Sequence, residues 1–473
     1  MFDNFPDKLR REAQLWRDEG LISASQYENL AERYRFKNLE AASRDRFVVT
    51  VIGIGSILLC LGIITFIATN WQSWSREVKF ILMISLFLST SITGFSTWVE
   101  AKSGNNEKRK QQQSKRILGE GLLILSAFFL GANILLMAQI FNISGSMAEL
   151  FLAWGFGVLV MAYSLCLNSL GIMAIILSQI GYWAGREDFG VSTVDWNWVS
   201  LAVRHMPLLS WLLFVPLAYF CRSRLIFVVA AFVFAGTLQL NLNPLPLLNL
   251  DNIAPWVASF AFALPPALFW SYDDLLFPTV NYRLFQPLAR NLALIFFGLV
   301  FYVLSFRWQW VAPTLNTLMP NSNNNLFMSL PVVDLGVLSG LAVLQWLSML
   351  RLRNNPPRRE VIFTLAVVTT FLAFIIITPF WHLAITRIDE LGSFIFNVLF
   401  AFLAFGLIRE GLKLNNRSRF WGGMLLLTLQ IISRVIEYNT DRLFQSLVFV
   451  ICGWALITAG LWFERRLPSK SSS

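Results

Sequence analysis

The class of fold is decided by the stretch LGEGLLILSAFFLGANILLMAQ, residues 118–139. It contains a single charged side chain, Glu120, among its 22 residues. A helix needs about 20 mostly apolar residues to cross the hydrocarbon core of a bilayer. This stretch therefore predicts a membrane-spanning helix, and similar stretches recur along the chain.

The composition of the whole chain agrees with this interpretation. Of its 473 residues, 56% are hydrophobic and only 14% are charged, with 42 Phe and 18 Trp. Soluble domains carry about 25% charged residues. The composition excludes an ordinary soluble protein and predicts a chain whose solvent is the lipid bilayer.

Fourteen apolar runs are visible after residue 46, and they predict an all-α polytopic membrane protein of about 14 spans. The runs are 47–69, 78–98, 118–139, 150–166, 169–185, 207–221, 225–240, 254–271, 291–306, 327–350, 360–381, 391–408, 420–436 and 444–463. Several are shorter than a usual span, and the loss of any pair leaves twelve. We expect the prolines at Pro216 and at Pro265-Pro266 to break their helices.

The distribution of positive charge predicts the orientation of these spans. With the N-terminus inside, the loops on the cytoplasmic side carry 30 of the 38 Lys and Arg residues. Cytoplasmic loops are enriched in these residues, so we expect an even number of spans and both termini in the cytosol. The net charge of +10 then reflects orientation and attraction to anionic lipid, and no nucleic-acid partner is expected.

A charged segment, residues 1–46, precedes the first apolar run and predicts a helical hairpin. Gly20 is placed to end a first helix, and Ser23 with Gln26 forms a capping box for a second. Four side chains are expected to close the hairpin or to bind a partner: Trp16, Ile22, Tyr27 and Tyr34. The hairpin is either a docking or self-association module or a cap that lies on the membrane surface through its basic face.

Polar residues in the third run are the first functional candidates. Glu120 lies at its cytoplasmic end, and Gln139 and Asn142 lie at the other end. Charged groups are costly inside a membrane and often mark function. The alternative for Glu120 is an ion pair with Arg116 one turn earlier.

The thirteenth run carries the second group of candidates. Gln430, Arg434 and Glu437 recur at three- and four-residue spacing and so share one helical face. They predict either a polar pocket, together with the candidates of the third run, or a local Arg434–Glu437 pair that is neutral as a unit.

No metal or cofactor site is evident in the sequence. The four cysteines, Cys60, Cys166, Cys221 and Cys452, lie in or beside separate runs without zinc-ligand spacing, and His205 and His382 stand alone. Asp334 follows Pro331 near a span end, where we expect it to face water. Phosphate-binding loops and hydrolase motifs are absent, so we expect no catalytic residues and no ATP-driven transport by this chain alone.

Three blocks of the sequence resemble the bacterial membrane proteins grouped as domain of unknown function 2157. The blocks are LRREAQLWRDEGLI at 9–22, Asn70-Trp71, and the segment from Gly119 to Gly145. The resemblance covers residues 7–165 and implies an integral membrane protein with a short cytoplasmic hairpin before its spans. Asn142 stands where that family commonly has a histidine, so no metal or proton role is carried over to it. The resemblance implies no reaction and no substrate.

Two functions from different classes follow from these observations. The first is a permease or carrier for a small or lipid-like solute, located in the bacterial inner membrane or in another internal membrane. The second is a scaffold or an envelope-stress or assembly partner that docks through its hairpin. In either case we expect a hairpin at 1–46, a membrane domain at 47–463 with a candidate midpoint at 241–253, and a cytoplasmic tail at 464–473.

Overall fold

The structure is a computed structural model that describes most of the chain. The described residues are 5–33, 58, 65, 69, 73–103, 109–189, 197–248, 255–272, 284–311, 332–351, 359–438 and 441–466. All the regular elements within these ranges are helices, which confirms the predicted all-α class. The chain divides into two compact units, Met1–Met83 and Ile84–Ser473, and we describe each by itself.

The first unit contains a short helical hairpin formed by α1 (Phe5–Asp18) and α2 (Ala24–Arg33). Gly20 ends α1 in the left-handed conformation, with φ +75°. The Leu21 N–H then donates to the Trp16 carbonyl at 2.8 Å, which satisfies one of the last free carbonyls of the helix. The predicted helix end at Gly20 is confirmed.

The start of α2 is a capping box, as the sequence predicts. The Ser23 N–H donates to Oε1 of Gln26 at 2.9 Å, and the Gln26 N–H donates to Oγ of Ser23 at 3.3 Å. The Arg17 guanidinium lies over the Tyr27 ring, 4.9 Å from its centroid, and links the two helices. Tyr34 and the rest of the predicted 1–46 module lie outside the described residues.

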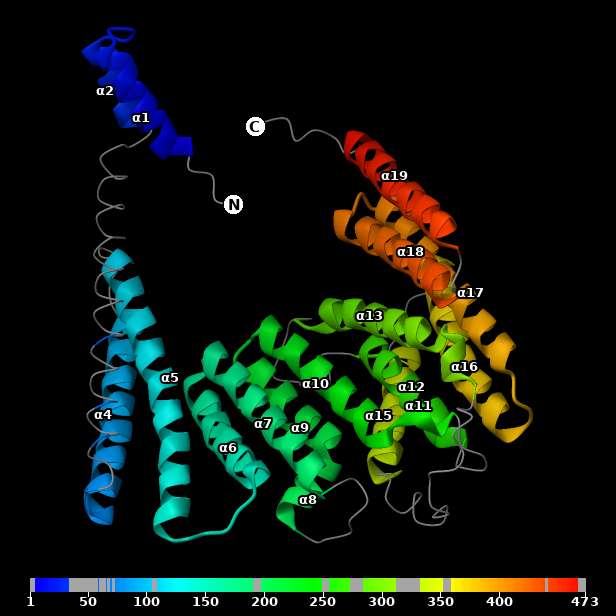
Figure 1. The fold of residues 1–473 in the computed structure, drawn as a ribbon, viewed down its shortest axis with the longest axis horizontal. Helices are drawn as coiled ribbons and strands as arrows, with labels where there is room; N and C mark the ends of the chain where they lie inside the picture. The colour runs from blue at the N-terminus through cyan, green and yellow to red at the C-terminus, as the bar shows by residue number, and fades with distance from the viewer. Residues whose placement is uncertain are drawn as a thin grey trace. The chain divides into compact units, whose positions relative to one another are not determined.

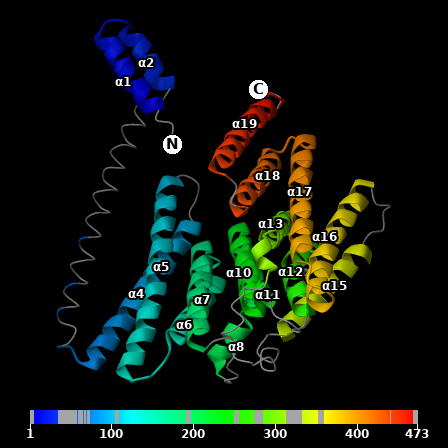
Figure 2. The same ribbon diagram turned by 45° about the vertical axis from the view of Figure 1, so that its right-hand side comes forward.

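A series of helices follows the hairpin (Figure 1). They are α4 (Arg76–Ser103), α5 (Arg109–Ile140), α6 (Met147–Leu165), α7 (Asn168–Phe189), α8 (Trp198–Arg204), α9 (Met206–Phe220), α10 (Arg224–Leu242), α11 (Pro244–Leu247), α12 (Pro255–Trp270), α13 (Gln286–Leu304), the 3-10 turn η3 (Arg307–Gln309), α15 (Val332–Arg351), α16 (Arg359–Ala384), α17 (Asp389–Lys413), α18 (Arg417–Glu437) and α19 (Arg442–Arg466). Neighbours in sequence pack together, most closely α6 with α7 and α17 with α18, and Figure 2 shows both pairs side by side.

These helices coincide with thirteen of the fourteen predicted spans, and the first, 47–69, lies largely outside the described residues. Within the described part of the chain, nine helices are long and apolar enough to cross a membrane. The pair α8 and α9, bent by 79°, would make a tenth. Helix α12 and the apolar part of α15, Val333–Leu347, are shorter, and α7 has a polar start and a charged end. The count of fourteen therefore stays a prediction.

The expected breaks at Pro216 and at Pro265-Pro266 do not occur, because α9 and α12 each continue through their prolines. A proline leaves the carbonyl four residues earlier without its N–H donor. For Pro265 that carbonyl is Ala261, and it accepts a hydrogen bond from Nε2 of Gln239 on α10 at 2.7 Å. A neighbouring helix thus replaces the missing donor, as the bilayer requires.

The largest buried cluster joins α5, α6, α7, α9, α10, α12, α13 and α15, so it contains helices from both sides of the candidate midpoint at 241–253. A second cluster joins α12, α13, α16 and α17 around Trp310. Large apolar side chains also stay exposed on the outer faces, among them Phe156, Leu344, Phe363 and Trp454. Such faces suit contact with lipid tails, which are as apolar as these side chains.

Candidate functional site

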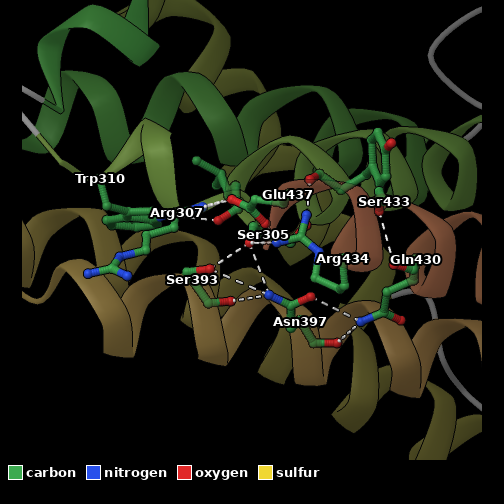
Figure 3. A network of polar contacts seen from close by, with 11 residues as sticks. Ser305, Arg307, Trp310, Ser393, Asn397, Gln430, Ser433, Arg434 and Glu437 are labelled. Atoms are coloured by element: carbon green, nitrogen blue, oxygen red, sulfur yellow. Dashed lines mark hydrogen bonds and ion pairs between the residues drawn. The ribbon is translucent and has the colours of Figure 1, made fainter. Parts of the chain in front are cut away.

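The carbonyl of Ser305 is the centre of a polar network between α13, α17 and α18 (Figure 3). Ser305 follows the last residue of α13, where helix carbonyls lack intrahelical donors. Its carbonyl accepts hydrogen bonds from Oγ of Ser393 at 2.6 Å, Nδ2 of Asn397 at 3.0 Å and Nη1 of Arg434 at 2.8 Å. We call this set, with Gln430 and Glu437, the Ser305 network.

Arg434 carries the positive charge of the network and is largely buried. Its guanidinium forms an ion pair with Glu437, and the two side chains are only 15% and 12% exposed. The guanidinium also lies over the Phe306 ring, 4.4 Å from the centroid. Glu437 accepts a further hydrogen bond from the Arg307 N–H at 2.7 Å. The predicted local Arg434–Glu437 pair is confirmed, and the network is neutral as a unit.

Gln430 extends the network toward the middle of α18. Its Nε2 donates to the carbonyl of Asn397 at 2.7 Å, which joins α18 to α17. Two buried side-chain atoms of the network have no hydrogen-bond partner among the described residues: Oε1 of Gln430 and Nε of Arg434. One is an acceptor and the other a donor, so a small polar molecule or a water could satisfy either of them.

The three candidates on α5 are not part of this network. Glu120 pairs with Arg116 at 3.1 Å, as the alternative in the sequence analysis expects. Gln139 is exposed near the other end of α5. Asn142 follows that end with φ +49°, in the left-handed region that Asn tolerates better than most residues. α5 packs on α6 and α7, whereas α18 packs on α17 and α19.

A second polar site, which sequence reasoning missed, lies where α8 meets α9. Pro207 follows the bend and cannot donate to the carbonyl of Val203. Nδ2 of Asn241 on α10 donates to the carbonyls of both Val203 and Arg204, at 2.9 Å each. The Tyr182 hydroxyl on α7 donates to Oδ1 of Asn241 at 2.7 Å and so fixes the amide. Both the nitrogen and the oxygen of the Asn241 amide are therefore hydrogen-bonded, and the nitrogen stabilises the bent backbone.

The residue at the bend is His205, and its partner is Asp334. Nδ1 of His205 lies 2.5 Å from Oδ1 of Asp334, which is the third residue of α15. The expectation that Asp334 faces water is wrong, because its side chain is fully buried. The contact joins residues 129 positions apart, so helix packing and not a local pattern buries the carboxyl group. We call His205, Asp334, Asn241 and Tyr182 the helix-break site.

The sequence holds a partial signal for the helix-break site. Asp334 is the only charged residue in the predicted run 327–350, and His205 stands two residues before a proline. Such lone ionisable residues in apolar runs are functional candidates. The pairing itself could not be predicted, because nothing local indicates that α9 and α15 meet.

His382 differs from His205 in having backbone partners on both ring nitrogens. Its Nδ1 accepts from the Ile388 N–H at 3.1 Å, and Nε2 then carries the proton that is donated to the Leu248 carbonyl at 3.2 Å. This buried ring packs edge-on against Trp310. The arrangement suits a structural histidine that links α16 to the segment after α11.

The described residues hold no group of three or more His, Cys, Asp and Glu side chains that could bind a metal ion. What the arrangement offers instead is a set of buried polar groups at helix ends inside an apolar bundle. Helices with apolar outer faces and such polar ends define a multi-pass helical membrane protein.

Comparison with known families agrees with this class. Residues 14–171, about a third of the chain, match the family described as "Predicted membrane protein (DUF2157)". The match runs from α1 into the start of α7 and confirms the resemblance found in the sequence. No curated protein and no solved structure matches the chain.

Proposed function

We propose that this membrane protein is a permease or carrier for a small or lipid-like solute. The observation that carries the proposal is the 79° bend between α8 and α9, two helices that together are long and apolar enough to span a bilayer. Carriers often bind their solutes at discontinuous helices, where backbone groups and polar side chains face a cavity. The helix-break site supplies such groups through His205, Asp334 and Asn241.

The two polar sites would have different roles in a carrier. The Ser305 network ties three helix ends together through an ion pair and several hydrogen bonds, which suits a rigid support. The helix-break site lies at a bend, where changes in a few backbone angles can move one helix segment against another. We propose that α8 is the moving part and that solute passes beside α9. Gln430, Arg434 and Glu437 then line the supporting side.

Thiol labelling tests for a pathway beside α9. Ser210 is buried one turn after the bend, and its hydroxyl has no partner among the described residues. In a cysteine-free background, Ser210→Cys should react with a membrane-impermeant thiol reagent from both sides of the membrane. Phe156→Cys, at an exposed position midway along α6, is the control and should stay unreactive in lipid.

The labelling result and a ligand screen together decide the proposal. Solutes that raise the thermal unfolding midpoint of the purified protein should also slow the labelling of Ser210→Cys. Failure of Ser210→Cys to react from either side, with and without these solutes, would remove the pathway.

The second candidate function is a scaffold that docks through the α1–α2 hairpin. The observation that favours it is that the hairpin has its own capping hydrogen bonds and exposes Leu15 and Leu21 by 52% and 69%. Trp16, Ile22 and Tyr27 remain the proposed docking residues. Deletion of 1–46 should abolish partner capture while membrane insertion continues, and unchanged co-purification of partners would contradict this function.

A further inference from the structure

Asp334 is the most unusual ionisable group in the described part of the chain. Its side chain is fully buried, Oδ1 contacts Nδ1 of His205, and Oδ2 has no hydrogen-bond partner among the described residues. A buried carboxyl group normally fills its hydrogen-bonding capacity or takes up a proton. Among the described residues, Asp334 therefore has an oxygen that no other group satisfies.

Two helix N-termini lie close to this carboxyl group. Asp334 lies in the first turn of α15, and His205 immediately precedes α9, so the positive ends of two helices meet at the pair. Helix N-termini stabilise a carboxylate, while burial favours the neutral acid. A neighbouring imidazole can give or take one proton within the physiological range of pH.

The chemistry favours a proton over a metal cation as the species bound. Hard cations take six or more oxygen ligands, and the described residues place one carboxyl group and one imidazole here. A histidine and an aspartate that share a hydrogen bond form a complete proton site by themselves. His205 remains 31% exposed, so its ring is not enclosed by the described helices.

We propose that the His205–Asp334 pair binds a proton, and that this proton is the ion whose movement is coupled to the bend between α8 and α9. The second part rests on the proposed carrier function. In each cycle one proton passes from water on one side to an N or O atom of the pair and leaves to water on the other side. Gain of the proton changes the charge of the pair, which alters the force between α9 and α15 and with it the angle of the bend.

Other titratable or charged groups lie on the elements packed around the pair. α7 contributes Tyr182, Arg186 and Glu187, α8 contributes Arg204, and α6 contributes Glu149 in its first turn. Arg186 is engaged with the carbonyl of Leu240 at 2.6 Å. α10, α11 and α12 carry no ionisable side chain near this end.

Proton uptake by the purified full-length protein tests the site without any solute. On acidification from about pH 8 to about pH 5, His205→Gln should take up about one proton fewer per chain than the unmodified protein, as measured with a pH-sensitive dye. His382→Gln is the matched control, because both nitrogens of His382 already hold backbone partners, and it should retain full uptake. Equal uptake by His205→Gln and the unmodified protein would overturn the proposal.

Infrared difference spectroscopy tests the carboxyl group independently. Acidification should change the carboxyl bands of Asp334, by a shift of its carboxylate stretch if the proton goes to the imidazole or by a new C=O band if it goes to the carboxyl group, and this change should be absent in Asp334→Asn. A spectrum identical in the two proteins would exclude Asp334 from the site. This measurement does not need His205→Gln to fold.

The labelling of Ser210→Cys separates the two proposals. If the bend responds to the proton, the rate of labelling should differ between acidic and alkaline pH, and His205→Gln should remove the difference. If His205→Gln takes up one proton fewer as predicted but Ser210→Cys does not react from either side, the proton site is supported and the carrier function is refuted. If Ser210→Cys is labelled from both sides but His205→Gln takes up as many protons as the unmodified protein, the carrier function is supported and the proton site is refuted.

Discussion

At the scale of single residues, Asn142 shows how a polar candidate acquires a structural explanation. It follows α5 with φ +49°, and the next N–H, from Ile143, donates to the Ala138 carbonyl at 2.9 Å. Asn142→Gly should leave stability nearly unchanged, whereas Asn142→Val should cost about 1–2 kcal/mol because a β-branched residue disfavours this conformation. Thermal unfolding in detergent measures both. Ile143→Val, at an exposed neighbour, is the control, and an Asn142→Val variant as stable as this control would contradict the assignment.

Substitutions at Arg434 and Glu437 test how strongly the two buried charges stabilise each other. Arg434→Leu leaves Glu437 buried without its cation and should destabilise the protein by about 3–5 kcal/mol. Arg434→Leu/Glu437→Leu should be less destabilising than the two single changes added together, as a double-mutant cycle of unfolding free energies would show. Additive effects would mean that the pair is not coupled.

The Arg116–Glu120 pair provides the matched control for this cycle. Its arginine is 68% exposed and its glutamate 31%. Exposed pairs contribute about 0–1 kcal/mol, so the corresponding changes at Arg116 and Glu120 should have small effects. A large effect there would instead point to a function for Glu120.

At the scale of helices, small residues allow α17 and α18 to pack closely. A Cβ atom added at Gly423 would lie 2.6 Å from the carbonyl oxygen of Ala404, a backbone atom that cannot rotate away. At the adjacent Gly422 the same atom would meet nothing within 4 Å. Close backbone approach at small residues is common between membrane helices.

The two glycines give opposite predictions for the same substitution. Alanine favours a helix over glycine by about 1 kcal/mol, so Gly422→Ala should be neutral or slightly stabilising. Gly423→Ala should destabilise, because α17 and α18 must separate, and the hydrogen bond between Gln430 and Asn397 lies on the same pair of helices. Unfolding midpoints of the two variants decide the matter, and a stabilised Gly423→Ala would show that the helices are not in close contact there.

α10 supports its neighbours in a way that helix propensity does not reveal. Gln239 and Asn241 donate to backbone carbonyls that prolines on α12 and at the start of α9 leave without donors. In one case the helix continues through the proline, and in the other it bends by 79°. The proline removes the same backbone hydrogen bond in both helices. Whether the helix continues or bends must therefore depend on how the neighbouring helices pack.

At the scale of the whole molecule, the predicted orientation places both polar sites at helix ends on the same side of the membrane. The Ser305 network involves the ends of runs 291–306 and 420–436, and the helix-break site those of 207–221 and 327–350. If the N-terminus is cytosolic, these ends all face the outer side. The proposed proton site would then be reached first from the outer side of the membrane.

Reporter fusions test this orientation. A fluorescent reporter fused after Asn105 should be active in the cytosol, and a phosphatase fused after Asn323 should be active outside, because positive charge holds the first loop inside. A phosphatase fused to the C-terminus should be inactive. An active one would mean an odd number of spans and would reverse the assignment of sides for part of the chain.

The positions of the helices were largely predictable from the sequence. Apolar runs of sufficient length indicate spans because each helix satisfies its own backbone hydrogen bonds, whatever its neighbours are. Local contacts were predictable for the same reason: the capping box at Ser23 and the pairs of Arg116 with Glu120 and Arg434 with Glu437 join residues three or four positions apart.

The sequence by itself therefore determined an all-α protein of many membrane helices and the ion pairs within single helices. Only the tertiary structure decided three further contacts. The Ser305 carbonyl accepts a hydrogen bond from Arg434, Asn241 donates to the carbonyl of Val203 at the bend before α9, and Asp334 is buried against His205. These contacts join residues from about 40 to 130 positions apart, as each depends on which helices pack together. Hydrophobic periodicity in a membrane does not specify that choice, because lipid and protein are equally apolar neighbours for a helix.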